Sequence, residues 1–294
     1  MSPIFGINHM FLFPEAITNE KEHTKTLKKF VKMDDFDAID VWVWRGEERS
    51  KEEIKILRDS GKIINYNIGD RYGEEKLYPS STDKKEQIRA YDTNMREIGY
   101  ALELGSKKIV IGSGPDDPSD REGAKERFGE LLHKLIEQLP SDVTLALEPT
   151  DRDLDKYFLF GPVEETTAFI KKMRKEGAKN LGMLLDMGHI PLVHETLESA
   201  LDKAEDTLVH IHLGNALISD KNSPYYGDRH IPWDYPGGEY TTDDGAKFIK
   251  LLKKRGYFDR ANATATVESR PMVGLTEEES VKLWIKLFNE AYND

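Results

Sequence analysis

The sequence contains no cysteine, which excludes disulfide bonds and thiolate ligands. Any metal ion would therefore be held by oxygen and nitrogen atoms. No stretch approaches the roughly 18 consecutive apolar residues that a membrane-spanning helix requires. The first five residues lack the basic and apolar segments of a signal peptide. We therefore expect a cytoplasmic protein with no membrane partner.

The chain also has fewer basic than acidic residues. The chain has 54 acidic and 42 basic residues, a formal net charge of −12. Such a surface repels the phosphate backbone of nucleic acids, so we expect no nucleic-acid partner. The content of 38% hydrophobic and 33% charged residues is typical of globular rather than disordered chains. A length of 294 residues allows a sizeable hydrophobic core.

Extended apolar runs alternate with helical patterns along the whole chain. In residues 88–102, apolar side chains recur at spacings of three and four, which predicts one buried helix face. Ser or Thr followed three residues later by Glu predicts helix starts at Ser50, Ser119 and Thr276. The eight predicted strands are 4–13, 36–44, 62–68, 107–112, 143–148, 180–186, 207–213 and 264–268.

Strands that alternate with helices predict parallel βαβ units. Eight units fit a closed (β/α)8 TIM barrel, an α/β fold, formed as a single domain over residues 1–294. A doubly wound open sheet is the main alternative, but no Gly-x-Gly-x-x-Gly motif opens the first helix. The long irregular stretch 214–240, in the seventh loop, is too long for a simple connection and predicts a functional loop.

Four predicted strands end at a residue that commonly binds metals. They are Glu148, Asp186, His212 and Glu268. Each has an ordinary explanation by itself, such as a helix cap at Asp186 or an ion pair between Glu268 and Arg270. Because the carboxyl ends of barrel strands share one rim, the four together predict one divalent metal site. Oxygen and imidazole ligands favour Mn²⁺, Mg²⁺ or Co²⁺, and they also admit Zn²⁺.

The motifs Leu-Glu148-Pro, Leu-Asp186-x-x-His189, His-x-His212 and Val-Glu268-Ser resemble those of the xylose-isomerase-like TIM barrels. This superfamily comprises sugar phosphate isomerases and epimerases and the family 2 AP endonucleases. The resemblance implies that Glu148, Asp186, His212 and Glu268 hold the metal. It implies a carbohydrate isomerase or epimerase that transfers a proton next to a carbonyl, through a metal-stabilised enediolate. Glu148 and Glu268 would move the proton, with His189 as an alternative shuttle.

Two positions depart from the ketose 3-epimerases of this family. Those enzymes place a glutamate six residues after the first ligand and an arginine six residues after the metal histidine. This chain has Leu154 and Ile218 there, so we expect different sugar contacts. The AP endonucleases share the Asp-x-His of the seventh loop, here Asp228 and His230. The third and fourth strands lack the further histidines of those enzymes, so we do not expect a nuclease.

The seventh loop also resembles the large subunit of bacterial C-glycoside deglycosidases, over residues 226–230 and 235–239. Those proteins are metal-dependent lyases that act on 3-oxo-glycosides. A lyase with a small partner subunit is therefore one alternative, and a non-catalytic sugar-binding barrel is another. The expected partner in each case is a small sugar or glycoside, and a homo-oligomer is also open. The expected substrate-binding residues are His9, Trp44, His189, Asp228, His230 and Arg270.

Overall fold

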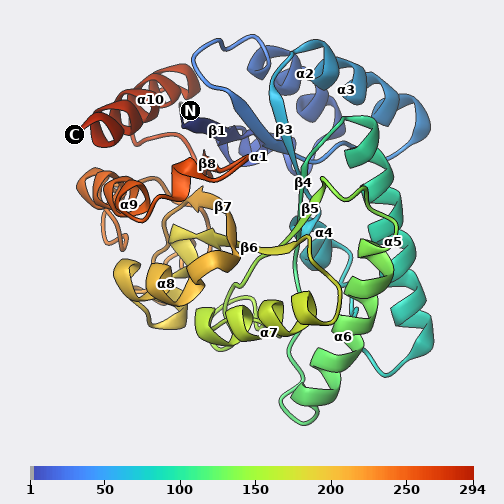
Figure 1. Cartoon of the computed structure of the whole chain (residues 1–294). Coiled ribbons are helices and arrows are strands. Elements are labelled where there is room, and N and C mark those ends of the chain that lie inside the picture. The colour runs from blue at the N-terminus through green and yellow to red at the C-terminus, as the bar shows by residue number, and fades with distance from the viewer. Residues whose placement is uncertain (1–2) are drawn as a thin grey trace.

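Eight parallel strands form a closed barrel in the computed structural model, with helices around it (Figure 1). The structure describes residues 3–294, apart from the side chains of residues 70, 74 and 205. Each strand pairs with the next, and β8 closes the barrel against β1. The strands are β1 Ile4–Asn8, β2 Ala38–Val41, β3 Ile63–Asn67, β4 Lys108–Ile111, β5 Thr144–Leu147, β6 Leu181–Asp186, β7 Leu208–Leu213 and β8 Thr264–Val267.

Most helices follow a strand and return the chain to the other end of the barrel. The longest is α5, which lies beside α6 in Figure 1. The helices are α1 His9–Leu12, α2 Glu20–Phe30, α3 Glu47–Asp59, α4 Gly69–Glu74, α5 Lys84–Glu103, α6 Arg121–Ile136, α7 Val163–Lys175, α8 Leu197–Ala204, α9 Thr242–Lys254 and α10 Glu277–Asn293. The (β/α)8 prediction is confirmed, and no helix in the described residues is long and apolar enough to cross a membrane. A single domain over 1–294 stays a prediction.

Alternation along the strands separates two hydrophobic environments. Ala146 and Leu184 pack with Val110 in a small cluster inside the barrel. Their neighbours Leu145 and Leu185 belong instead to the large core between strands and helices. Since side chains two residues apart share a face, Glu148 and Asp186 lie on the inner face of their strands, at the carboxyl rim.

Several predicted boundaries were wrong. The first strand ends at Asn8 and not at residue 13, because the Asn8 side chain accepts from the Met10 amide and starts α1. The capping box at Thr276 is confirmed. Ser50 lies inside α3, and Ser119 precedes α6, where its hydroxyl binds Asp117 instead of a helix amide.

The predicted stripe over 88–102 also needs correction. Helix α5 is present, but Ile88 is 59% exposed and lies off the buried face. Ala90, Asn94 and Glu97 are buried in its place. Polar side chains therefore occupy part of the face that apolar spacing alone did not identify.

The chain between β7 and α9 has no helix or strand, as predicted for 214–240. One side chain organises it. Asn215 donates to the carbonyls of Pro232 and Tyr240, and its oxygen accepts from the amides of Ala216 and Tyr240. The two ends of the loop are thereby held together, next to the end of β7.

Candidate metal centre and active site

Four side chains converge at the carboxyl rim of the barrel. Glu148, Asp186, His212 and Glu268 are all buried, and one potential ligand atom from each lies within 4.8 Å of the others. The register explains this convergence, since Asp186 pairs with His212 and His212 pairs with Thr266, two residues before Glu268. Three carboxylates and one imidazole thus face a single point, as the sequence predicted.

Three atoms of this group are buried and lack a well-aligned hydrogen bond, namely Asp186 Oδ2, His212 Nδ1 and Glu268 Oε2, and the last two lie 2.6 Å apart as an ion pair. The second oxygen of each of these carboxylates is occupied. Asp186 Oδ1 accepts from the Gly188 amide at 2.8 Å, and Glu268 Oε1 accepts from Asn8 Nδ2 at 2.8 Å. Leaving a buried polar atom unpaired costs about 1–3 kcal/mol. A divalent cation would satisfy all three atoms, so the residues fit such an ion.

The raised pKa values of two carboxyl groups in this site also indicate that a cation would stabilise it. Burial raises the pKa of Glu268 well above its usual range, and the nearby His212 imidazole only partly offsets that. Burial likewise raises the pKa of Glu148, with opposing effects from His189 and His212 and a further rise from Asp186. Ionised carboxylates packed this closely repel one another, and a bound cation offsets that repulsion.

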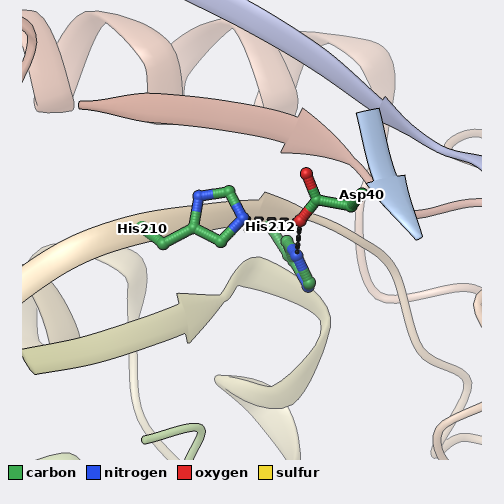
Figure 2. Close-up of side chains that lie close together, drawn as sticks. All are labelled: Asp40, His210 and His212. Atoms are coloured by element: carbon green, nitrogen blue, oxygen red, sulfur yellow. Dashed lines mark hydrogen bonds and ion pairs between the residues drawn. The ribbon is translucent and has the colours of Figure 1, made fainter. Parts of the chain in front are cut away.

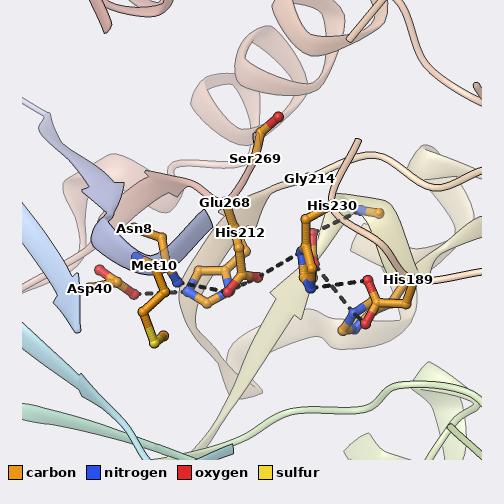
Figure 3. Close-up of polar contacts among 12 residues, drawn as sticks. Asn8, Met10, Asp40, His189, His212, Gly214, His230, Glu268 and Ser269 are labelled. Atoms are coloured by element: carbon orange, nitrogen blue, oxygen red, sulfur yellow. Dashed lines mark hydrogen bonds and ion pairs between the residues drawn. The ribbon is translucent and has the colours of Figure 1, made fainter. Parts of the chain in front are cut away.

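A second polar group lies beside the first (Figure 3). Asp228, from the long loop after β7, lies 3.2 Å from His189 Nε2, 3.3 Å from His230 Nε2 and 3.1 Å from Lys156 Nζ. Burial by itself would lower the pKa of His189, but the carboxylates of Asp228 and Asp186 raise it well above its usual range. Burial lowers the pKa of His230 to about 4. The loop therefore adds one carboxylate and one imidazole beside His189, which lies in the short turn after β6.

A cavity of about 310 Å³ opens above these residues. Its polar side includes Glu148, Glu268, His189, Asp228, His230, Lys156, Arg229 and Arg270. Its apolar side includes Met10, Phe11, Ile17, Trp42 and Phe158. The His230 ring stacks on Phe11 with 3.6 Å between centroids, which joins the two sides. The volume lies at the small end of the range for ligand pockets.

The family model described as "Xylose isomerase-like TIM barrel" matches residues 29–286. The chain belongs to this family. A D-psicose 3-epimerase of Enterocloster bolteae is 24% identical over 261 residues, which cover 85% of this chain and 77% of that protein.

Solved structures of other proteins share the fold. A D-psicose 3-epimerase from Clostridium cellulolyticum H10, with D-tagatose, has a TM-score of 0.65 and 18% identity, covering 98% of this chain and 95% of its own. An AP endonuclease, family 2, from Brucella melitensis has a TM-score of 0.70 and 18% identity, covering 97% and 99%. A 3-keto-D-glucoside 4-epimerase from E. coli has a TM-score of 0.65 and 16% identity, covering 97% and 99%.

In this xylose isomerase-like barrel, two expected substrate contacts lie elsewhere. His9 begins helix α1, and its Nε2 lies 3.0 Å from the Thr26 hydroxyl of α2, away from the cavity. Trp44 packs against Trp42 and His23, and it is Trp42 that reaches the cavity. The error at His9 has the same cause as the misplaced end of β1. The structure brings His189, Asp228, His230 and Arg270 to the cavity, as expected.

Sequence reasoning missed Asp40 and Lys156. Lys156 reaches the cavity because the Asp151 carboxylate accepts from the amides of Leu154, Asp155 and Lys156 and bends this loop. Asp40 lies on β2, beneath the four ligands. Burial raises the pKa of its carboxyl, but the imidazoles of His210 and His212 more than offset this and hold that pKa well below its usual range. An acid within the apolar run 36–44 was the available signal.

A substitution at Gly214 tests the site without replacing any of the four proposed ligand residues. A Cβ at this position would lie 2.5 Å from Asp186 Oδ1 and would displace that carboxylate. We expect Gly214→Ala to weaken Mn²⁺ binding by about 10–100-fold, as is typical when a group that orients a ligand is disturbed. Calorimetric titration of the metal-free protein measures this. Gly99→Ala is the matched control, because a Cβ at Gly99 of α5 meets no atom within 4 Å, and unchanged affinity in both variants would contradict the site.

Proposed function

We propose that this protein is a divalent-metal-dependent carbohydrate isomerase or epimerase. The observation that carries the proposal is the convergence of four potential ligand atoms within 4.8 Å, three of them buried without a well-aligned hydrogen bond, under a small cavity with a polar and an apolar side. The D-psicose 3-epimerase relative supports a sugar isomerase or epimerase. Glu148, Asp186, His212 and Glu268 would hold the ion, with Mn²⁺, Mg²⁺ or Co²⁺ favoured by the donor atoms and Zn²⁺ also compatible.

When bound there, the ion polarises a substrate carbonyl and makes the neighbouring C–H group more acidic. Glu148 and Glu268 directly follow β5 and β8, and both line the cavity. The carboxylate of one takes the proton from carbon, while the C–H electron pair moves toward the carbonyl. In an epimerase the other carboxyl returns a proton to the opposite face.

His189 and His230 are alternative proton carriers. His189 Nε2 is buried, has no hydrogen-bond partner and lies 3.2 Å from Asp228. His189 Nδ1 lies 3.1 Å from the Pro149 carbonyl, which orients the ring. In an isomerase, one proton would instead move between neighbouring carbon atoms and a second between their two oxygens, and these imidazoles line the cavity where they could carry the second. Asp228 and Arg270 would bind sugar hydroxyl groups.

A lyase that acts on 3-oxo-glycosides is the second candidate. Phe11, Trp42 and Phe158 form an apolar wall of the cavity that suits an aglycone attached to the sugar. The same proton abstraction would then expel the aglycone. A cytoplasmic location, a homo-oligomer and a small partner subunit also stay predictions.

Incubation in D₂O tests the proposed function. With Mn²⁺ and a panel of ketoses and 3-oxo-glycosides, we expect deuterium at the carbon next to the carbonyl, observed by NMR and mass spectrometry. Release of aglycone would favour the lyase. Protein treated with a chelator is the control and should leave every substrate unlabelled. No incorporation into any member of the panel would contradict both enzymatic candidates and favour a sugar-binding protein.

A further inference from the structure

A single buried carboxylate lies beneath the four ligands and joins two histidines of β7. Asp40 Oδ2 lies 2.6 Å from His210 Nε2 and 2.8 Å from His212 Nε2 (Figure 2). Its other oxygen accepts from Asn65 Nδ2 at 2.7 Å and from the Thr266 hydroxyl at 2.8 Å. All of these groups are buried. Asp40 therefore accepts two hydrogen bonds on each oxygen.

This saturation argues against a second metal ion at Asp40. Asp40, His210 and His212 are metal-ligand types, and one atom of each lies within 4.8 Å of the others. An ion there would have to displace short hydrogen bonds that already satisfy the carboxylate. The atoms without a well-aligned hydrogen bond lie one layer higher, at His212 Nδ1 and the carboxylates of Asp186 and Glu268. Asp40 consequently acts on the metal site through His212.

The direction of each hydrogen bond follows from Asp40. An ionised carboxylate can only accept, so both histidines must donate to it through Nε2. A neutral imidazole carries one N–H, which leaves Nδ1 of His212 with a free lone pair. That nitrogen lies 2.6 Å from Glu268 Oε2 and 3.9 Å from Glu148 Oε1. A contact of 2.6 Å with Glu268 requires a proton between the two atoms when no ion is bound, and a bound ion would take the place of that proton on the Nδ1 lone pair.

The hydrogen bonds below Asp40, along the barrel interior, also have fixed directions. His210 also donates through Nε2, so its Nδ1 accepts from the Thr264 hydroxyl at 2.6 Å. The Thr264 oxygen in turn accepts from Lys108 Nζ at 2.5 Å, and the ammonium group can only donate. Every donor and acceptor from Lys108 to His212 is thus consistent with one arrangement of protons.

We propose that Asp40 is a positioning residue that fixes His212 with its proton on Nε2 and its Nδ1 lone pair directed at the metal. The chain of His210, Thr264 and Lys108 holds Asp40 in this role from below. Carboxylates that bind the far nitrogen of a metal-bound histidine fix its tautomer and ring orientation. The inference rests on the metal site of the proposed function.

The tautomers are measured first, in the wild-type protein labelled with ¹⁵N-histidine. In the Zn²⁺-loaded protein, we expect NMR to show the proton of His212 on Nε2 and the metal on Nδ1. In the metal-free protein at alkaline pH, the neutral rings of His212 and His210 should both keep the proton on Nε2. A proton on Nδ1 of His212 would overturn the proposal. A proton on Nδ1 of His210, donated to the Thr264 carbonyl 3.2 Å away, would overturn the arrangement proposed for the residues below Asp40.

Asp40→Asn then tests the effect on the metal. Both histidines donate to one oxygen of Asp40, and Asn65 donates to the other. The amide has one acceptor oxygen and one donor NH₂, so in either orientation its NH₂ faces a donor, the Asn65 amide or the two imidazoles, and the side chain must shift. We expect Mn²⁺ affinity to fall by about 10–100-fold. Thr266→Val is the matched control, because it removes a hydrogen bond to Asp40 Oδ1 and leaves the contact with His212. Equal affinity in Asp40→Asn and Thr266→Val would overturn the proposal.

The two proposals fail in different ways. A wild-type protein that binds no divalent ion would reject the proposed function, while the tautomers of the metal-free protein would still decide the role of Asp40. If Asp40→Asn does not fold, the wild-type spectra decide it. A folded variant with weakened metal binding, beside an unaffected control, supports both proposals.

Discussion

Glu268→Gln should lower kcat by about 10²–10⁴, the usual contribution of a positioned acid or base. Glu268 lines the cavity and has one oxygen bonded to Asn8 and the other without a well-aligned hydrogen bond. The glutamine amide oxygen can keep the bond from Asn8, so the side chain stays in place. The amide cannot accept a proton from carbon, and it weakens the hold on the ion. Steady-state rates and deuterium exchange, with the substrate found in D₂O, measure the loss.

Glu47→Gln is the control for Glu268→Gln. Glu47 is 82% exposed on α3, where it pairs with Lys51, and it lies outside the cavity. Its replacement should leave kcat unchanged. Circular dichroism establishes that both variants remain folded. A folded Glu268→Gln variant with wild-type kcat would remove Glu268 from the proposed mechanism.

Asp186→Asn should abolish tight metal binding while leaving the metal-free protein at least as stable as wild type. In the metal-free protein three carboxylates share a buried point, and the repulsion relieved by the loss of one charge should outweigh the lost contact of Asp186 with His189, 3.4 Å away. The asparagine oxygen can still accept from the Gly188 amide, and its NH₂ replaces the Oδ2 that lacks a well-aligned hydrogen bond. A ligand present at about 100 times its Kd stabilises the folded state by about 2.7 kcal/mol, and the variant should lose that gain.

Thermal unfolding with and without Mn²⁺ measures this loss of stabilisation by the ion. Wild type should gain in Tm on addition of the ion, and Asp186→Asn should not. Asp202→Asn removes an exposed acid that pairs with Arg255, and it should respond to Mn²⁺ like wild type. An Asp186→Asn variant with the full wild-type gain would exclude Asp186 as a ligand.

The sequence predicted that Glu148, Asp186, His212 and Glu268 converge, because their positions follow simple geometry. Parallel strands in a barrel end on one rim, and alternation decides which side chains point inward. Ala146 before Glu148 and Leu184 before Asp186 therefore indicated the inner face from local patterns alone. The four ligands needed no knowledge of loop structure.

Other parts of the site depend on contacts between distant residues. Asp40 meets His212 across 172 positions of sequence, and no local pattern records that contact. Lys156 enters the cavity through a turn that the Asp151 carboxylate holds. His9 was misplaced because an Asn8 side-chain cap ends β1 early, which hydrophobic spacing does not report. Tertiary hydrogen bonds set these positions.

The two residues that depart from the ketose 3-epimerase pattern lie outside the cavity. Leu154 and Ile218 do not line the cavity, whereas Lys156, Asp228 and His230 do. The long loop after β7 thus supplies Asp228 and His230 to the cavity, and the turn after β5 supplies Lys156. We expect substrate choice to depend on this loop and on the apolar wall opposite it.

The most direct test of this account is a calorimetric titration of the metal-free protein with Mn²⁺, in parallel with His212→Ala. We predict one ion bound per chain in wild type and no measurable binding in the variant, because His212 Nδ1 is one of the converging ligand atoms. Absence of binding in wild type, or equal binding by both proteins, would contradict the metal centre on which the proposed function rests.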